Sequence, residues 1–284
     1  MSARGKQTKR LRRLLALLLV LFSTGVSLLG YALLLPEASG TDKKEKGGAV
    51  LDYSHADQGY FLIKRESKKK QRLTVSKGKS TYNYDLPGDG KYHVIPFQMG
   101  SGKYEITLYE NTSGKKYSSK ISKDVSVNLV DENIPFLYPN IYSNYGSKTK
   151  AVVKAAELCE GLTSDLDKYK AISAFIKSSV SYDYAKAGSV MNGKTKTYIP
   201  KVDAVLKAGK GICFDYAALA ACMLRSQGVP TQIVMGYFVQ EGKSSKEKAY
   251  HAWNMVLIDG KWSRADITFS LTGTKGSYTN EFIY

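Results

Sequence analysis

Three residues that lie far apart in the sequence have the types that cysteine-based acyl transfer requires: Cys213, His251 and Asp266. Cys213 follows a Gly-Lys-Gly turn and precedes a helical pattern, so we expect it in the first turn of a helix. Unpaired backbone N–H groups and the helix dipole favour an anion there, and the thiolate is the nucleophilic form of cysteine. The pattern predicts that Cys213 attacks a carbonyl carbon, that His251 takes the thiol proton and that Asp266 orients the imidazole.

The same residues allow other interpretations. A cysteine in a helix is commonly a small buried residue, and only the downstream histidine and aspartate favour a nucleophile at Cys213. A zinc site is compatible with Cys213, His251 and Asp266, but the paired Cys-x-x-Cys or His-x-x-x-His spacing is missing, so we expect neither metal nor cofactor. Cys222 lies nine residues after Cys213 and therefore points to the opposite side of the helix. Three cysteines, with Cys159 as the third, do not suit a disulfide scaffold.

Helices must position the thiol. Apolar residues recur at helical spacing from Ala217 to Leu224, and Gly228 and Pro230 end that helix. Two amphipathic helices are predicted upstream, with the apolar faces Val152, Ala156 and Cys159 in one and Tyr169, Ile172, Ile176 and Val180 in the other.

A β-hairpin must position the other two residues. Residues 231–240, 250–258 and 261–269 predict strands, and Asp259-Gly260 predicts a two-residue turn between the last two. In that register Trp253 faces Asp266 and His251 faces Thr268. His251 and Asp266 would then be diagonal neighbours on one face, about 7 to 8 Å apart at the backbone, unless a bulge shifts the register.

Acyl transfer also needs hydrogen-bond donors for the oxyanion that forms on the attacked carbonyl. The backbone N–H of Cys213 at the helix start is the first expected donor. The hydroxyl of Tyr182 is a candidate for the second, and the alternative is that the Tyr182 ring only packs against its neighbours.

Three segments, GKGICFDYAALAACMLRSQGVPTQIVMGY, HAWNMV and WSRADIT, in this order and at these spacings, resemble the transglutaminase-like domain. This papain-like superfamily of cysteine enzymes is common in bacterial envelope proteins. The resemblance covers about residues 150–284 and implies a triad of Cys213, His251 and Asp266 in an α+β fold, with the cysteine helix packed against an antiparallel sheet. Animal members have a tryptophan upstream of the cysteine as oxyanion donor, where this chain has only tyrosines. Calcium dependence is not implied, because no suitable cluster of acidic side chains is present.

The N-terminus predicts a membrane anchor. Residues 1–13 contain six basic and no acidic residues, and residues 14–35 form an uncharged run of 22 residues. At about 1.5 Å per helical residue, this run spans a bilayer core of roughly 30 Å. A cleaved signal peptide has a shorter apolar core and a small-residue cleavage site, so an uncleaved signal anchor is favoured over it. The positive-inside rule then predicts a single-pass cell-membrane protein with a cytoplasmic N-terminus and extracellular C-terminal domains.

Composition divides the rest of the chain. Residues 36–48 are a polar linker, and residues 49–130 hold about seven short strand patterns, from GYFLIKR to KKYSSKI and DVSVNLV, typical of a small antiparallel β-sandwich. Residues 131–150 hold two prolines and no sustained period, which predicts a second linker that packs on the next domain. Residues 151–284 form the transglutaminase-like domain, so the predicted fold class is α+β with a β-sandwich and a transmembrane helix before it.

The charge and the motifs bound the function. The net charge of +17 is spread along the chain, which suits contact with an anionic cell envelope. The sequence lacks a basic patch interleaved with aromatic residues, so we expect no nucleic-acid partner. We expect a thioester on Cys213, formed from a peptide or glutamine amide of an extracytoplasmic protein or cell-wall peptide. Water would resolve it in a protease or deamidase, and an amine in a transglutaminase. The alternative is a non-catalytic envelope binding or adhesion protein that uses the same domain as a scaffold.

Overall fold

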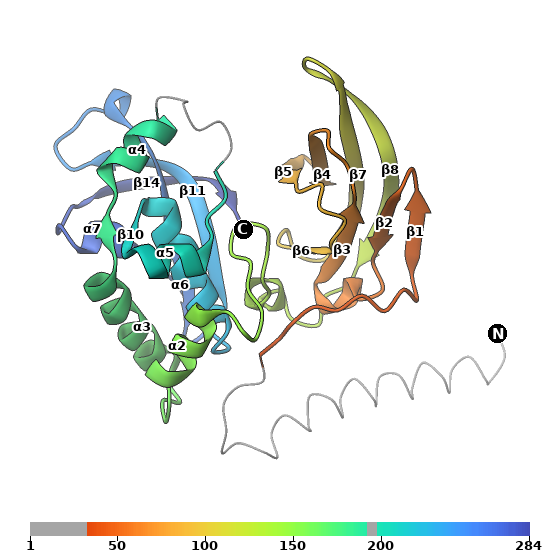
Figure 1. Cartoon of the computed structure of the whole chain (residues 1–284). Coiled ribbons are helices and arrows are strands. Elements are labelled where there is room, and N and C mark those ends of the chain that lie inside the picture. Colours follow the sequence, from red (N-terminus) through yellow and green to blue (C-terminus); the bar gives the residue numbers. More distant parts are fainter. Residues whose placement is uncertain (1–32, 192–197) are drawn as a thin grey trace.

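The computed structural model describes residues 33–191 and 198–284, which form two domains side by side (Figure 1). The predicted basic tail, residues 1–13, and all but the last three residues of the predicted transmembrane segment, residues 14–35, lie outside the described residues. Within the described ranges, no helix is both long and apolar enough to cross a membrane.

The N-terminal domain is built from two four-stranded antiparallel sheets whose apolar side chains share one core. Phe61 of the first sheet and Ile106 of the second are both fully buried in this core. The first sheet has the order β1-β2-β3-β6, with strands β1 (Lys43–Lys46), β2 (Ala49–Asp52), β3 (Tyr60–Arg65) and β6 (His93–Pro96). The second has the order β5-β4-β7-β8, with strands β4 (Gln71–Lys77), β5 (Ser80–Leu86), β7 (Gly102–Ser113) and β8 (Lys116–Val127).

The strand patterns differ from this architecture at two places. The patterns KKYSSKI and DVSVNLV, predicted as two strands, form the single strand β8, because the paired strand β7 is equally long and absorbs bulges in the ladder. The charged segment Lys43–Lys46, which falls in the expected linker, is an edge strand paired with β2. Lysines are common on edge strands because they discourage pairing with other chains, so a polar composition does not exclude a strand there.

Residues 131–150, predicted to be a linker that packs on the next domain, contact both domains. A short 3₁₀ turn, η2 (Ile134–Leu137), lies near the start of this segment. Tyr138 is buried against the sandwich, where its ring meets that of Tyr60 edge-on with centroids 4.9 Å apart. The hydroxyl of Ser143 donates a hydrogen bond of 2.9 Å to the carbonyl of Ala218, which lies in the helix that carries the thiol.

The C-terminal domain arranges its helices around one buried helix, α6 (Cys213–Arg225) (Figure 1). Every residue of α6 after Cys213 is buried, and the helix packs against α2, α3 and α5 and against two strands of the sheet. The other helices are α2 (Lys150–Leu158), α3 (Asp165–Ser179), α4 (Tyr184–Met191), α5 (Val202–Ala208) and α7 (Ile267–Ser270). The strands are β9 (Ser181–Tyr182), β10 (Lys210–Gly211), β11 (Thr231–Gln240), β12 (Ala249–Ile258), β13 (Lys261–Ala265) and β14 (Gly276–Ile283), of which four form the sheet β13-β12-β11-β14.

The helical periodicities are confirmed in α3 and shifted in α2. Ile172 and Ile176 are fully buried in α3, where the spacing predicts its apolar face. In α2 the predicted Ala156 is exposed, and its neighbour Ala155 is buried instead. Two adjacent alanines make the phase of so short a helix ambiguous by one residue.

The predicted hairpin turn and its register are confirmed. Asp259 and Gly260 both have left-handed backbone angles, as a two-residue hairpin requires, and Ile258 pairs with Lys261. The ladder continues in that register and stops at the pair Asn254 and Ala265.

The prediction of a strand through residue 269 was wrong. The chain leaves the sheet after Ala265 and starts α7, so the expected pairs Trp253 with Asp266 and His251 with Thr268 do not form. The reason is local: Asp266 becomes the N-cap of α7, and its Oδ1 accepts a 3.0 Å hydrogen bond from the backbone N–H of Phe269.

Candidate active site

The turn before α6 places Cys213 as the first residue of the helix, with its side chain partly exposed. Gly209 ends α5 with a left-handed conformation, and the chain then runs through β10 into the helix. A Cβ atom on Gly211 would lie 2.7 Å from the Cβ of Asp215, so only glycine allows this close approach. The thiol therefore lies at the positive end of a buried helix and still faces solvent.

His251 projects from β12 and is 5% exposed. Its Nε2 lies 2.7 Å from Oδ2 of Asp266, and its ring stacks on the ring of Phe269 with centroids 4.2 Å apart. Burial lowers the pKa of His251, but hydrogen bonds and charge interactions with Asp266 and Cys213 outweigh burial and raise the pKa to about 9. The imidazolium form is therefore favoured at neutral pH.

Cys213 and His251 are brought together by the fold. The hydrogen bond and the charge interaction of Cys213 are among the causes that raise the pKa of His251. Because Nε2 is engaged by Asp266, Nδ1 is the ring nitrogen left for the thiol. A thiol, an imidazole and a carboxylate thus form one connected series from α6 through β12 to the start of α7.

Asp266 accepts hydrogen bonds from three different elements. Its Oδ2 binds both His251 and the hydroxyl of Tyr278, which donates at 2.9 Å from β14, while Oδ1 caps α7. This arrangement orients the carboxylate and, through it, the imidazole. The sequence singled out Asp266 from the hairpin register but missed Tyr278, which belongs to a strand that pairs with β11 and carries no motif.

The family comparison gives these residues a context. Residues 153–267 match the model of the transglutaminase-like superfamily, and this range contains Cys213, His251 and Asp266. The chain contains a transglutaminase-like domain.

Two curated relatives are similar to this chain over part of their own length. Human kyphoscoliosis peptidase is 30% identical over 203 residues, which is 70% of this chain and 28% of the relative. The mouse protein of the same name is 30% identical over 133 residues, which is 45% of this chain and 19% of the relative. The chain thus spans less than a third of the length of these relatives.

Solved structures show looser similarity. A protein from Cytophaga hutchinsonii described as a cysteine protease aligns with 79% of this chain and 83% of its own, at 15% identity and a TM-score of 0.40. The periplasmic domain of TgpA from Pseudomonas aeruginosa aligns with 84% of this chain and 77% of its own, at 16% identity and a TM-score of 0.38.

Tyr182 lies beside Cys213. Strand β9 pairs in parallel with β10, which sets Tyr182 opposite Gly211. The Tyr182 hydroxyl accepts a hydrogen bond from the backbone N–H of Cys213, and burial together with the charge of Cys213 raises the pKa of Tyr182 to about 12. The ring also packs edge-on against Tyr184 with centroids 4.9 Å apart. Tyr182 therefore packs on Tyr184 and also lies next to the backbone N–H of Cys213.

A buried ionic cluster holds the first turn of α6. Asp215 is completely buried; its Oδ2 accepts the backbone N–H of Ile212 at 2.9 Å and pairs with Nζ of Lys186 at 3.0 Å. Its Oδ1 accepts a hydrogen bond from the hydroxyl of Tyr198. Burial lowers the pKa of Lys186, but its hydrogen bonds to Tyr198 and Asp215 outweigh this effect and raise it. Sequence analysis missed this cluster, although an aspartate three residues after a helix N-cap is a recognisable capping signal.

The other cysteines are remote from this chemistry. Cys222 is fully buried, and burial raises the pKa of its thiol well above the usual value. Burial also raises the pKa of Cys159. Both cysteines therefore stay in the less reactive thiol form. For Cys222 this agrees with the prediction that it cannot share a site with Cys213.

Proposed function

We propose that this chain is a cysteine-dependent amidase or acyltransferase that uses Cys213 as nucleophile, His251 as acid and base and Asp266 as the orienting carboxylate. One observation carries the proposal: Asp266 occupies Nε2 of His251, which leaves Nδ1 for a thiol at a helix N-terminus. This is the order of nucleophile, base and orienting group that activated thiols require.

The reaction proceeds in two halves. Nδ1 of His251 holds the proton of the Cys213 thiol, and the sulfur attacks the carbonyl carbon of an amide, forming a C–S bond. The imidazolium then gives its proton to the departing nitrogen as the C–N bond breaks, which leaves a thioester and a free amine. In the second half, neutral His251 takes a proton from water or from an amine, which attacks the thioester and releases the Cys213 thiolate as leaving group.

The oxyanion is stabilised from the start of α6. A substrate oxygen that enters between Cys213 and Tyr182 receives a hydrogen bond from the backbone N–H of Cys213 and another from the Tyr182 hydroxyl. The buried Asp215 cluster supports this geometry, because it fixes the backbone of the same helical turn.

The acyl acceptor and the cellular location are part of the same proposal. The name of the human and mouse relatives, kyphoscoliosis peptidase, favours water as acceptor and a peptide bond as substrate. The apolar run of residues 14–35 with its basic flank supports a membrane-anchored enzyme whose substrate is an extracytoplasmic protein or cell-wall peptide.

The test uses the full chain, casein as the probe protein and a fluorescent primary amine. New casein fragments identify hydrolysis, and label on casein identifies transfer to the amine. Cys213→Ala is expected to abolish both, together with alkylation by iodoacetamide near neutral pH. The matched control Cys159→Ala, which removes a buried thiol, is expected to behave as the wild type. Undiminished alkylation of Cys213→Ala, or turnover by that variant, contradicts the proposal.

A further inference from the structure

A hollow of about 230 Å³ lies between the β-sandwich and the transglutaminase-like domain. The sandwich lines it with polar side chains of β4 and β5, and the transglutaminase-like domain lines it mainly with aromatic and apolar side chains. These residues are Arg72, Asn83 and Asp85 on the first side, and Tyr198, Ile199, Met235 and, from the segment 131–150 between the domains, Tyr142 on the second. We call this space the interdomain hollow.

The two walls of the interdomain hollow are held together by aromatic packing. The ring of Tyr84 stacks with that of Tyr142 at 6.0 Å between centroids, and the ring of Tyr82 meets that of Tyr284 edge-on at 5.4 Å. The hydroxyl of Tyr82 also accepts the backbone N–H of Ile283 at 3.3 Å. These contacts join the second sheet of the sandwich to the last strand of the other domain, so the hollow is a fixed part of the fold.

The hollow is directly connected to the start of α6. Tyr198, in its wall, donates a hydrogen bond to Asp215, which holds the first turn of the helix. Tyr142, also in its wall, lies with its ring 5.5 Å from that of Phe214, the residue after Cys213. A ligand in the hollow therefore contacts side chains that bear on the nucleophile's own turn.

The sandwich wall offers groups suited to a peptide. Arg72 and Asp85 form a loose pair at 3.8 Å, and each side chain is about half exposed, at 48% and 51%. A guanidinium donates to peptide carbonyls, and so does the amide N–H of Asn83, whose Oδ1 accepts the Thr74 hydroxyl at 2.9 Å. Tyrosine and methionine on the opposite wall suit the apolar part of a side chain.

Strand β5 adds a second argument for a peptide. It is the edge strand of its sheet and lies on the side of the sandwich that faces the transglutaminase-like domain (Figure 1). In the described chain β5 has a single strand partner, β4, so the outer row of its backbone N–H and C=O groups has no partner strand. Such an edge is complementary to an extended polypeptide, and two residues of this strand, Asn83 and Asp85, line the hollow.

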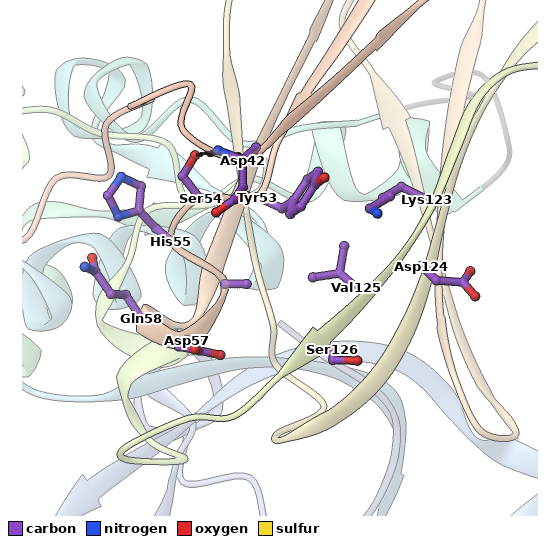
Figure 2. Close-up of a pocket in the computed structure, with 11 residues that line it drawn as sticks. Asp42, Tyr53, Ser54, His55, Asp57, Gln58, Lys123, Asp124, Val125 and Ser126 are labelled. Atoms are coloured by element: carbon purple, nitrogen blue, oxygen red, sulfur yellow. Dashed lines mark hydrogen bonds between the residues drawn. The ribbon is translucent and has the colours of Figure 1, made fainter. Parts of the chain in front are cut away.

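A larger hollow, of about 390 Å³, offers no comparable case (Figure 2). All of its lining residues belong to the N-terminal part of the chain, so it has no wall from the domain that carries Cys213. We therefore assign no ligand to it.

We propose that the interdomain hollow is a substrate subsite in which the β-sandwich binds an extended polypeptide whose scissile or transferred amide reaches Cys213. This inference rests on the proposed function and gives the sandwich a role in it. Arg72 and Asp85 are specificity residues for the polypeptide, and they take no part in the covalent steps at Cys213.

The test compares two exposed ion pairs of the same sheet. Arg72→Ala and Asp85→Ala remove the pair in the hollow, and Lys103→Ala and Asp124→Ala remove a pair outside it. With full-length protein and casein, we expect KM to rise about tenfold for the first two variants while kcat changes less than twofold. The two control variants are expected to match the wild type.

A binding measurement separates this inference from the proposed function. Casein is titrated into full-length Cys213→Ala, with and without Arg72→Ala, and the second variant is expected to bind about tenfold more weakly. Loss of turnover in every variant, with this difference in binding intact, refutes the proposed function alone. Equal binding by the two variants, or equal KM values for Arg72→Ala and Lys103→Ala, overturns the subsite.

Iodoacetamide gives the third readout. The reagent is too small to need the hollow, so its rate of reaction with Cys213 reports the active site itself. A variant with slow alkylation has a disturbed active site, and in that case the conservative variant Arg72→Lys decides. If Arg72→Lys restores the alkylation rate while KM stays raised, the result supports the subsite. If it restores both the alkylation rate and KM, the effect of Arg72→Ala came from folding, and the result counts against the subsite.

Discussion

Both domains bury a carboxylate among hydrogen-bond donors, but the partners of the two carboxylates differ in kind. In the sandwich, Glu110 is bound by Arg65, by the hydroxyl of Ser67 at 2.6 Å and by Nζ of Lys120 at 3.1 Å. Hydrogen bonds from Arg65 and Ser67 lead the causes that lower the pKa of Glu110 to about 2. An arginine and a lysine keep their protons at any ordinary pH, so this cluster has one charge state.

The carboxylate of Asp266 in the transglutaminase-like domain has a different set of partners. It binds His251 and Tyr278, and His251 in turn meets Cys213. Unlike arginine and lysine, an imidazole loses its proton within the ordinary pH range, and for His251 the pKa is raised to about 9. The comparison teaches that burial of a carboxylate does not by itself indicate catalysis. The protonation equilibria of its partners distinguish a structural ionic cluster from a proton-transfer site.

The largest expected difference comes from His251→Ala. This change removes the acid and base, and kcat/KM for casein should fall by about 10⁴-fold. The unfolding midpoint in urea reports whether the fold is retained. Activity within tenfold of the wild type in a folded His251→Ala protein would contradict a role of His251 in proton transfer.

Asp266→Asn should reduce kcat/KM by about 10³-fold and change its pH dependence. The amide keeps an oxygen for the N-cap of α7 but loses the charge that helps raise the pKa of His251 to about 9. In the wild type, the imidazolium is lost as pH rises through about 9, so activity should fall there. In Asp266→Asn that decline should begin at lower pH, and NMR titration of the imidazole measures the shift. An unchanged alkaline limb would contradict the assigned role of Asp266.

Tyr182→Phe should have a smaller effect, about 10²-fold on kcat. The change removes one oxyanion donor and leaves the ring packing on Tyr184 in place. Because the lost hydrogen bond forms in the transition state, kcat should fall more than KM rises. Tyr184→Phe is the matched control, since Tyr184 is 77% exposed, and it should retain full activity. Equal kcat and KM values for the two variants would show that the Tyr182 side chain only packs and does not stabilise the oxyanion.

Glu110→Gln should leave kcat/KM within twofold of the wild type and lower the free energy of unfolding by about 2 kcal/mol. Because the folded pKa of Glu110 is depressed to about 2 from 4.5, its contribution to stability is complete above pH 4.5. This contribution is lost as pH falls through about 2. Urea unfolding at pH 7 and at pH 3 measures both parts. A large loss of activity with unchanged stability would contradict a purely structural role for the Glu110 cluster.

Local patterns predicted those parts of the site that local structure decides. The Asp259-Gly260 turn determines the register of β12 and β13, and extending this register along the sequence is enough to predict that His251 and Asp266 are neighbours. The helix beginning at Cys213 follows from its turn and its apolar spacing. The strand predicted through Asp266 was wrong because a capping side chain competes with strand pairing, and the alternating pattern alone does not show which interaction prevails.

Long-range partners were beyond the sequence patterns. Tyr278 reaches Asp266 from a strand that pairs with β11, and Lys186 and Tyr198 reach Asp215 from segments before the cysteine helix. None of these residues is at a spacing that links it to the site along the chain. The charged strand β1 escaped prediction for a related reason, since its pairing with β2 comes from neighbours and not from its own composition.

The guanidinium of Arg225, at the far end of α6 from the thiol, has a consequence for cooperativity. It is 2% exposed, and its nitrogens donate to the carbonyls of Thr231, Tyr138 and Tyr284 at 2.8, 2.9 and 2.9 Å. If any one of these three carbonyls moved away, a buried positive charge would lose a hydrogen-bond partner, which costs free energy. Residues 131–150, α6 and β14 should therefore unfold in a single calorimetric transition. A protease that cleaves the chain near Tyr138 should unfold the whole C-terminal domain.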